Sequence, residues 1–344
     1  MTVRFATPSE IVNWNEHIIA NPDGGNMFQS FEFAMQKETG GYNAHFVFFD
    51  DIAVTILEKN APGLGKLWYI PKGPGVTDSK ELLRFLKDIK KFATKHKAFA
   101  IRIESELSRD EGVFLSKNGL KKSSPIIPNP STITLDISED LENVLASLNQ
   151  KGRHAINRAK RDGVTVKAVK SSEKNCKIMY ELLAETAKGQ FGIRSYEYFK
   201  TFWQRFEKAN LGQLFFAYYE NQVVAGAYAI TYGKKSTYKD GASIRKRTAY
   251  GASHLLQWNI IEWAKSRGVL VHDFCGSPPS EEINNPNHKH YGIGLFKSSF
   301  NKNVTDYIGC YDYAINSKKY AIWIKFGEKV AKRIHYYKNH DSYF

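Results

Sequence analysis

A phenylalanine and a lysine stand side by side in the stretch YGIGLFKSSF, where Gly292 and Gly294 precede Phe296 and Lys297. Glycine lets a backbone approach a ligand closely. An aromatic ring next to a cation suits an unpaired nucleic-acid base and its phosphate. The pattern therefore indicates a site for the single-stranded end of a nucleic acid, but a core phenylalanine beside a solvated lysine would have the same spacing.

The stretch FGIRSYEYFKTF places Arg194 and Tyr198 four residues apart. Residues at this spacing share one face of a helix, so a planar cation and a phenol could bind one phosphorylated ligand. A surface arginine beside a half-buried tyrosine is the alternative.

Two more side chains have the types and positions of ligand-binding groups. Lys37 ends a short aromatic helix predicted for MFQSFEFAMQK, where a lysine also suits the helix dipole. Tyr238, in TYKDGAS, lies on a predicted strand that ends at Gly241, where its phenol could reach a groove. Packing against a neighbouring strand is the alternative for Tyr238.

A run of seven cations extends from Lys151 to Lys170 with Asp162 as its only acid. As a helix, the first part would bury Ile156 and Ala159 and leave a basic face. The chain carries a formal charge of +14, which favours anionic partners such as phosphates, nucleic acid or acidic lipid surfaces. An ordinary solvated face is the alternative for this helix.

Several kinds of chemistry are excluded by the residues present. The three cysteines, Cys176, Cys275 and Cys310, lie far apart without the spacing of a disulfide framework or a zinc site, which predicts a reducing cytoplasm. No GxSxG, HExxH, Walker or GxGxxG motif occurs. The polar first residues predict no signal peptide, and no run of eighteen apolar residues predicts a membrane span.

The loop that cradles acyl-coenzyme A needs Gln or Arg, two residues, Gly, one residue, then Gly or Ala. The nearest candidate, RKRTAYGASHLL, has Gly251 and Ala252 adjacent and places Arg247 one residue too far away. We therefore expect no coenzyme A, no metal and no other cofactor.

Hydrophobic periodicity predicts the same order of elements twice along the chain. The first series has strands at 44–50, 52–58 and 66–71, a helix at 78–97 and a strand at 99–104. The second has a strand at 131–137, helices at 139–161, 172–188 and 195–208, strands at 212–220, 222–232 and 235–243, a helix at 250–266 and a strand at 269–276. This duplicated α/β unit resembles the acyl-CoA N-acyltransferase (GNAT-like) fold, which implies two tandem domains with mixed sheets flanked by helices and a cleft between or along them.

We predict a first domain at 1–146, a second at 147–316, and a C-terminal helix at 317–344. The helix carries an apolar stripe with cations elsewhere on its circumference. The members of the stripe are Ile322, Phe326, Val330, Ile334 and Tyr337. Docking of this stripe on the first domain explains it most simply; a membrane-surface anchor has the same pattern.

Several motifs in order carry a resemblance to one family. They are KxRxxIxxAxxxGV from Lys151 to Val164, then YKDGAS, YGASHLLQW, HDFCG, GLFKSSF and IGCYDY. Together they cover nearly the whole chain, which resembles the FemABX family of aminoacyl-tRNA-dependent transferases that build peptidoglycan side chains.

The resemblance implies a reaction and roles for single residues. An aminoacyl ester on tRNA would be attacked by an amine of a peptidoglycan precursor, without a metal or redox cofactor. Lys37 and Arg194 would bind the precursor diphosphate, and Tyr198 and Tyr238 would line its site. Phe296 and Lys297 would meet the tRNA acceptor end, with Lys297 also countering charge on the tetrahedral oxyanion.

Some members of the family carry a coiled-coil arm between the helix around Tyr198 and the strand at Gly212. No heptads occur there, so this chain resembles the armless type, whose members use the soluble UDP-linked pentapeptide; a lipid-linked acceptor stays open. The basic helix, through Arg153, Arg158 and Arg161, would bind tRNA. Glu104 is the one carboxylate nominated as a general base, and an ion-paired or surface role is its alternative.

Two rival functions remain at this stage: a coenzyme A-dependent N-acyltransferase acting on a small amine, and a non-catalytic tRNA-binding protein. For the transferase we expect a cytoplasmic monomer, with peripheral contact to the inner membrane surface if the acceptor is lipid-linked.

Overall fold

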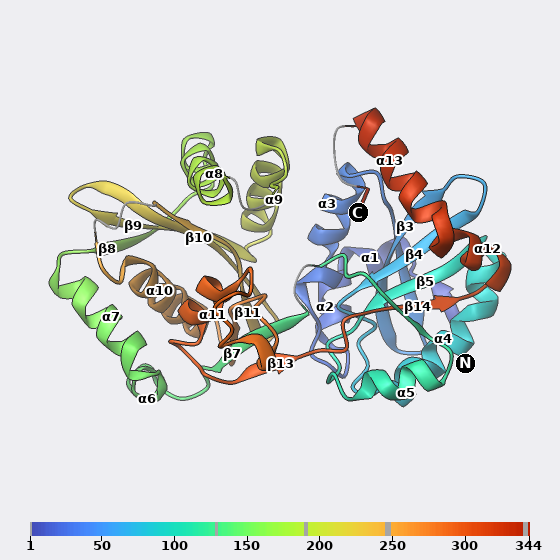
Figure 1. Cartoon of the computed structure of the whole chain (residues 1–344), viewed down its shortest axis with the longest axis horizontal. Helices are drawn as coiled ribbons and strands as arrows, with labels where there is room; N and C mark the ends of the chain where they lie inside the picture. Colours follow the sequence, from blue (N-terminus) through green and yellow to red (C-terminus); the bar gives the residue numbers. More distant parts are fainter. Residues whose placement is uncertain (1, 128–129, 189–191, 245–248, 340–342) are drawn as a thin grey trace. The chain divides into compact units, whose positions relative to one another are not determined.

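The computed structural model describes residues 2–127, 130–188, 192–244, 249–339 and 343–344. The chain divides into two compact units (Figure 1). Unit 1 consists of Met1–Pro130 with Asp306–Phe344, and unit 2 consists of Ser131–Thr305. Each unit is a mixed sheet flanked by helices, which confirms the predicted fold class.

The sheet of unit 1 has seven strands in the order β1-β2-β3-β4-β5-β14-β6. Their bounds are β1 (Val3–Phe5), β2 (Asn43–Phe49), β3 (Ile52–Ala61), β4 (Gly65–Pro71), β5 (Ala98–Glu104), β6 (Lys121–Ser123) and β14 (Cys310–Ala314). The first four strands are antiparallel, and β5 returns parallel to β4 after the helix α4. The helical elements are α1 (Pro8–Val12), α2 (Trp14–Ile19), the 3-10 turn η1 (Met27–Gln29), α3 (Phe31–Thr39), α4 (Ser79–Lys95), α5 (Glu111–Lys117), α12 (Ser317–Ile322), the π-helical turn η3 (Trp323–Gly327) and α13 (Glu328–Asn339).

The helix α4 shows how local sequence positions the core of unit 1. Its N-cap Asp78 accepts hydrogen bonds from the backbone N–H groups of Lys80 and Glu81, both at 2.8 Å, which satisfies donors that the first turn leaves open. The apolar residues that follow at helical spacing are buried against the sheet. They are Leu82, Leu83, Phe85, Leu86, Ile89 and Ala93. The predicted helix at 78–97 is therefore confirmed to within two residues at its C-terminal end.

The sheet of unit 2 also has seven strands, in the order β13-β7-β12-β11-β10-β9-β8. Their bounds are β7 (Ser131–Asp136), β8 (Thr165–Val169), β9 (Gly212–Tyr219), β10 (Gln222–Tyr232), β11 (Lys235–Ser243), β12 (Val271–Asp273) and β13 (Val304–Asp306). The helices are α6 (Leu141–Ser147), α7 (Gln150–Arg161), α8 (Glu173–Ala187), α9 (Tyr196–Lys208), α10 (Ala252–Ser266), the 3-10 turn η2 (Ser280–Glu282) and α11 (Tyr291–Lys297).

The two units repeat one order of elements. In unit 1 the antiparallel strands β2, β3 and β4 lead through α4 to the parallel strand β5. In unit 2 the antiparallel strands β9, β10 and β11 lead through α10 to the parallel strand β12. This is the duplication that the sequence periodicity indicated.

The boundaries of the units differ from those predicted at 146 and 316. The strand β7 and the helix α6, expected in the first domain, lie in unit 2, where β7 pairs with β12. The strand β14, expected in the second domain, pairs with β5 in unit 1. Both strands pair with partners far away in the chain, which local periodicity does not reveal. The single helix predicted at 139–161 is two helices, separated by extended backbone at Leu148 and Asn149.

The C-terminal segment belongs to unit 1, but it docks with a different face from the one predicted. Tyr320, Trp323 and Ala331 are buried with Leu67 and Phe99 of the sheet. Arg102 holds the segment further through Glu328, at 3.0 Å. All five residues of the predicted stripe are exposed instead. The buried residues Trp323 and Ala331 are offset by one residue from Ile322 and Val330 of the stripe, and the bulk of Trp323 fills the space beside Phe99.

Among the described residues, no helix is both long and apolar enough to cross a membrane. Within the same residues, no three His, Cys, Asp or Glu side chains gather as a metal site would require.

Candidate active site

Lys297 is a buried lysine whose amine is fixed by two backbone carbonyls. It ends α11 with its side chain only 7% exposed, and Nζ donates hydrogen bonds to the carbonyl oxygens of Cys275 at 2.7 Å and Gly276 at 2.6 Å. Burial lowers the pKa of Lys297 to about 8, while nearby Cys275 and Asp273 act in the opposite direction. The solvated lysine considered from sequence is therefore wrong.

The two carbonyls are aimed by a strained turn directly after β12. Cys275 has φ of +59°, a left-handed conformation that costs free energy in a residue with a side chain. The carboxylate of Asp273 holds this turn by accepting from the backbone N–H of Cys275 at 2.7 Å and from the hydroxyl of Thr132 at 2.5 Å. The HDFCG motif thus provides the two backbone carbonyls that accept hydrogen bonds from the amine of Lys297.

Tyr238 lies next to this lysine. Its ring centroid is 6.0 Å from Nζ of Lys297. Its phenol rests against Gly241, where an added Cβ would lie 1.6 Å from the phenol oxygen, so only glycine leaves room for this orientation. Burial raises the pKa of Tyr238 well above its usual range, and the nearby Gln257 side chain acts in the opposite direction. The phenol is therefore neutral and can donate or accept a hydrogen bond.

A buried polar row that sequence reasoning missed runs behind Lys297. The hydroxyl of Ser236 lies 2.8 Å from Nδ1 of His272, and Nε2 of His272 lies 3.3 Å from Oε1 of Gln257. His272 is fully buried, and burial together with the charge of Lys297 lowers its pKa to about 3. This imidazole is neutral at physiological pH. The quoted motifs HDFCG and YGASHLLQW contain His272 and Gln257, but their spacing gave no sign that they would meet.

Phe296 precedes Lys297 on α11 and is half-buried. Its ring meets those of His254 and Phe300 edge-on, with centroids 4.9 and 5.6 Å apart. Gly294 lets α11 pack closely, because a Cβ there would lie 2.8 Å from Ile283 and 3.0 Å from Pro278. Phe296 thus has part of its ring in the core and part exposed, and its contact with a nucleic acid base stays a prediction.

Arg194 and Tyr198 are brought together as the spacing predicted, although Arg194 lies outside the helix. Ser195 is the N-cap of α9, so Arg194 precedes the first turn. Its guanidinium carbon lies 5.3 Å from the ring centroid of Tyr198. The Tyr180 hydroxyl donates to the carbonyl oxygen of Arg194 at 3.2 Å and fixes the backbone there.

Lys239 connects this pair with the Lys297 region and was not predicted as a site residue. Its Nζ lies 3.1 Å from Oδ1 of Asp240, whose other oxygen accepts from Nε1 of Trp203 at 2.9 Å. Burial opposes the charge of Lys239, but Asp240 and the Tyr198 phenol raise its pKa, and Cys275 contributes in the same direction. The charge of Lys239 is therefore influenced both by Tyr198, which contacts Arg194, and by Cys275, whose carbonyl binds Lys297. A lysine that follows Tyr238 in a predicted strand was the only available signal.

Lys37 lies in unit 1, whereas the other predicted cations and phenols of the site lie in unit 2. It is in the last turn of α3, yet its side chain is only 8% exposed. Its ammonium lies 4.9 Å from the ring centroid of Tyr42, and the ammonium of Lys59 lies 4.4 Å from the same centroid. Two buried cations therefore share one aromatic ring, which an ordinary surface lysine at a helix end would not do.

Glu104, the nominated general base, is committed to structural contacts in unit 1. Its carboxylate accepts from the Tyr69 hydroxyl at 2.6 Å and from the backbone N–H groups of Ile126 and Ile127 at 2.5 and 3.1 Å. The cavity beside it measures about 10 Å³, which holds a water molecule at most. This geometry does not favour Glu104 as a base for a substrate amine.

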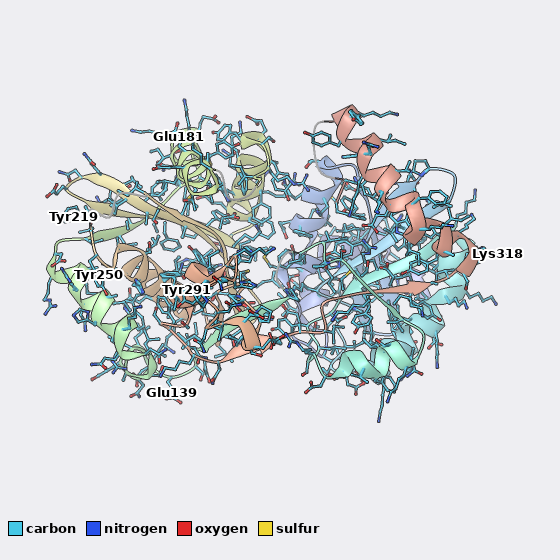
Figure 2. All side chains as sticks on the ribbon, viewed as in Figure 1. Glu139, Glu181, Tyr219, Tyr250, Tyr291 and Lys318 are labelled. Carbon is cyan, nitrogen blue, oxygen red and sulfur yellow. The ribbon has the colours of Figure 1, made fainter. Side chains whose placement is uncertain are left out.

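The three arginines of α7 that were predicted to contact tRNA differ in their contacts within the protein. Arg153 donates to the carbonyl oxygens of Ala146, at 2.8 Å, and of Leu148, at the end of α6. Arg158 pairs with Asp162 at 3.3 Å and lies over the ring of Tyr250, which is labelled in Figure 2. Arg161 is exposed. Arg153 therefore has a structural role, and Arg158 and Arg161 remain the predicted tRNA contacts.

Comparison with known proteins decides the family. The FemAB family model matches residues 128–219 and 207–326, more than half of the chain. The chain belongs to the FemAB family. The match spans every predicted site residue of unit 2, from Arg153 to Lys297, and leaves Lys37 and Glu104 outside it.

Individual FemAB relatives resemble the whole chain at low identity. The lipid II:glycine glycyltransferase of Staphylococcus haemolyticus (strain JCSC1435) is 22% identical over 389 residues, covering 88% of this chain and 91% of the relative. The enzyme of the same name from Staphylococcus aureus (strain MRSA252) is 23% identical with the same coverage. A crystal structure of FemX is 20% identical, covers 95% of this chain and all of that one, and has a TM-score of 0.80, which shows the shared fold.

The chain is an aminoacyltransferase of the armless type. Only residues 209–211 separate α9 from β9, so no coiled-coil arm is inserted where some FemABX members carry one. The resemblance drawn from the ordered motifs is thereby confirmed.

Proposed function

We propose that this FemAB protein transfers an aminoacyl group from aminoacyl-tRNA to an amine of a peptidoglycan precursor stem peptide, in the synthesis of cell-wall cross-bridges. The family match and the two related glycyltransferases support the class of reaction. Because the names of those relatives specify lipid II, we favour a lipid-linked acceptor over the soluble UDP-linked pentapeptide.

The observation that carries the proposal is the buried, doubly anchored amine of Lys297. An ammonium has three N–H donors, and the carbonyls of Cys275 and Gly276 take two of them. We assign the third N–H donor to the carbonyl oxygen of the aminoacyl ester. This oxygen becomes an oxyanion when the acceptor amine attacks. A preorganised donor in a site shielded from water stabilises that charge without reorganisation.

The chemical step is ester aminolysis. The acceptor nitrogen bonds to the ester carbon, and the tetrahedral intermediate then breaks its bond to the tRNA ribose oxygen. The proton lost by the amine goes to that oxygen, so one amide and one free ribose hydroxyl result. Since the ester is already activated, orientation of the two substrates and stabilisation of the oxyanion supply most of the catalysis.

The remaining predicted residues receive binding roles. Arg194 and Lys37 bind the diphosphate of the precursor, and Tyr198 and Tyr238 line its site. Phe296 contacts the tRNA acceptor end. The clustering of Arg194 with Tyr198, and of Tyr238 with Lys297, supports these roles within unit 2. Arg158 and Arg161 of α7 attract tRNA through its phosphates.

A mass measurement tests the proposal. The protein is incubated with a mixture of charged tRNAs and either lipid-linked or UDP-linked pentapeptide precursor, and the precursor mass is recorded. We expect an increase equal to one amino acid residue, with the lipid-linked form as the better acceptor. No mass change with any charged tRNA and either precursor would contradict the proposal.

An acceptor linked to lipid requires the enzyme to work at a membrane surface. We therefore include in the proposed function a peripheral contact with the cytoplasmic face of the membrane, made by a monomer.

A further inference from the structure

The C-terminal segment of unit 1 exposes an unusual amount of apolar surface. Among the described residues, fifteen large hydrophobic side chains are exposed, and seven of them lie within residues 322–337. These seven are Ile322, Ile324, Phe326, Val330, Ile334, Tyr336 and Tyr337. A soluble helix scatters such residues singly, whereas a concentration of this kind marks an interaction surface.

The exposed stripe is not a consequence of poor docking. The segment is anchored by its other face through Trp323, which is fully buried, and through Tyr320 and Ala331. The carboxylate of Asp312 accepts from the Tyr320 hydroxyl at 3.1 Å and also pairs with buried Arg102. The exposed row is therefore held rigidly in a fixed orientation.

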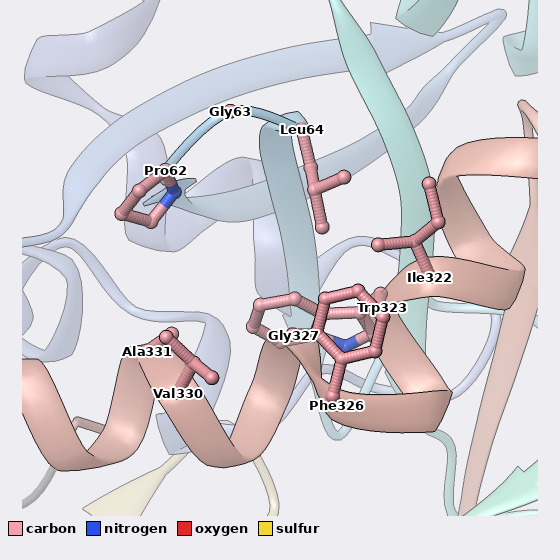
Figure 3. Close-up of a pocket in the computed structure, with 9 residues that line it drawn as sticks. All are labelled: Pro62, Gly63, Leu64, Ile322, Trp323, Phe326, Gly327, Val330 and Ala331. Atoms are coloured by element: carbon pink, nitrogen blue, oxygen red, sulfur yellow. The ribbon is translucent and has the colours of Figure 1, made fainter.

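The turn between β3 and β4 extends the apolar surface. Pro62, Gly63 and Leu64 lie opposite Ile322, Phe326 and Val330 and enclose a pocket of about 220 Å³ that opens to solvent (Figure 3). An added Cβ on Gly327 would lie 3.1 Å from Leu64, so this glycine lets the turn and the helix approach. The pocket and the exposed stripe of Ile322, Phe326, Val330, Ile334 and Tyr337 form one surface, which we call the C-terminal apolar face.

The segment that carries the C-terminal apolar face is strongly basic. Residues 317–338 contain seven lysines and arginines and one carboxylate, so their formal charge is 7 − 1, or +6. The cations are Lys318, Lys319, Lys325, Lys329, Lys332, Arg333 and Lys338, and all of them are exposed. The single carboxylate, Glu328, is already paired with Arg102 and Lys332 at 3.0 and 2.6 Å.

We infer that the C-terminal apolar face is a membrane-binding surface that inserts into the interfacial region of an anionic lipid bilayer. Apolar and aromatic side chains bordered by lysines are the pattern of helices that lie in this region. A second copy of the chain is disfavoured, because a self-complementary contact would bring +6 against +6. Nucleic acid would use the cations but leave the exposed aliphatic side chains without a partner.

Vesicle sedimentation tests the inference. The full chain is mixed with vesicles of phosphatidylcholine alone or with about 30% phosphatidylglycerol, which gives a roughly physiological surface charge. We expect binding to the anionic vesicles only, weakened by salt. Replacing Phe326, Val330 and Ile334 by serine should lower the partition coefficient about tenfold or more, and replacing Lys325, Lys329 and Arg333 by glutamine should do the same for anionic vesicles.

Matched controls use exposed residues elsewhere in the chain. Val12, Val113 and Leu270 are exposed aliphatic residues for the serine control, and Lys87, Lys90 and Lys91 of α4 are exposed lysines for the glutamine control. Melting curves establish that each variant is folded. No binding of the wild-type chain to anionic vesicles at low salt, or an equal loss in the controls, would overturn the inference.

Two further outcomes would also overturn it. One is a concentration-dependent dimer, seen by analytical ultracentrifugation, that the serine variant abolishes while vesicle binding stays unchanged. The other is weaker tRNA binding by the serine variant with unchanged vesicle binding. The inference deepens the proposed membrane contact, but vesicle binding involves no aminoacyl transfer. A chain that binds vesicles and transfers nothing would retain this surface and lose only the proposed function.

Discussion

Single residues show the widest gap between what the sequence predicts and what the fold adds. The pair Phe296-Lys297, preceded by two glycines, predicted a site for the single-stranded end of a nucleic acid. That Lys297 is buried follows from carbonyls some twenty residues earlier in the chain, which no local pattern reveals. The same is true of His272 and Gln257, which meet only because β12 lies beside β11 and α10 covers them.

The lowered pKa of Lys297 has a consequence for stability. Its pKa is about 8 in the folded chain and near 10.5 when unfolded, so between these values the unfolded state binds the extra proton. The free energy of unfolding therefore rises with pH through this window. We expect the wild-type chain to gain on the order of 3 kcal/mol relative to Lys297→Met between pH 8 and 10.5.

Chemical denaturation of both proteins across this pH range measures the difference and cancels the titration of other groups. A difference that is constant with pH would mean that the amine is not destabilised by burial.

The contact between Tyr238 and Gly241 gives a second prediction at this scale. Gly241→Ala must displace the phenol, because the new Cβ would overlap its oxygen. Misplacing a group that lines the acceptor site should raise the KM for the precursor about tenfold or more. Steady-state kinetics with varied precursor checks this.

The double variant Tyr238→Ala/Gly241→Ala is the control. If displacement of the phenol is the whole effect, the double variant should be no worse than Tyr238→Ala alone. Additive losses would instead assign Gly241 an independent role.

At the scale of elements, periodicity predicted most helices and strands correctly, and it failed where tertiary contacts decide. The C-terminal segment has two i, i+4 rows one residue apart, at 322, 326, 330 and at 323, 327, 331. Periodicity favoured the first row for burial, whereas Trp323 and Ala331 of the second row are buried. A π-helical turn spans Trp323–Gly327 within this segment, and periodicity predicted an uninterrupted helix there.

The helix α7 illustrates how one element divides its cations between structure and binding. Arg153 satisfies carbonyls at the end of α6, so Arg153→Gln should lower the free energy of unfolding by about 1 to 2 kcal/mol. Arg158→Gln/Arg161→Gln should leave stability nearly unchanged, because the contacts of Arg158 with Asp162 and with the ring of Tyr250 are exposed to solvent. Urea denaturation distinguishes the two variants.

The same double variant tests tRNA binding by α7. Loss of two phosphate contacts should reduce the slope of log affinity against log salt by about 1.5 to 2. Filter binding of aminoacyl-tRNA at several salt concentrations measures the slope, and substitution of the exposed lysines Lys87 and Lys90 on α4 is the control. An unchanged slope would remove α7 from the tRNA site.

For the whole molecule, the sequence predicted the duplicated α/β unit and the family, because repeated periodicity and ordered motifs are spread over the chain. It misplaced both boundaries, since β7 and β14 pair with distant strands. Of the predicted site residues, Lys37 and Glu104 belong to unit 1 and the others belong to unit 2.

The central claim is that the anchored ammonium of Lys297 stabilises the oxyanion of an aminoacyl ester. The most direct measurement is the single-turnover rate of transfer from aminoacyl-tRNA to lipid-linked precursor, for the wild-type chain and for Lys297→Met. Removing one preorganised donor should lower the rate roughly 10²- to 10³-fold while the variant stays folded and binds both substrates. A folded Lys297→Met protein that transfers at the wild-type rate would contradict the account.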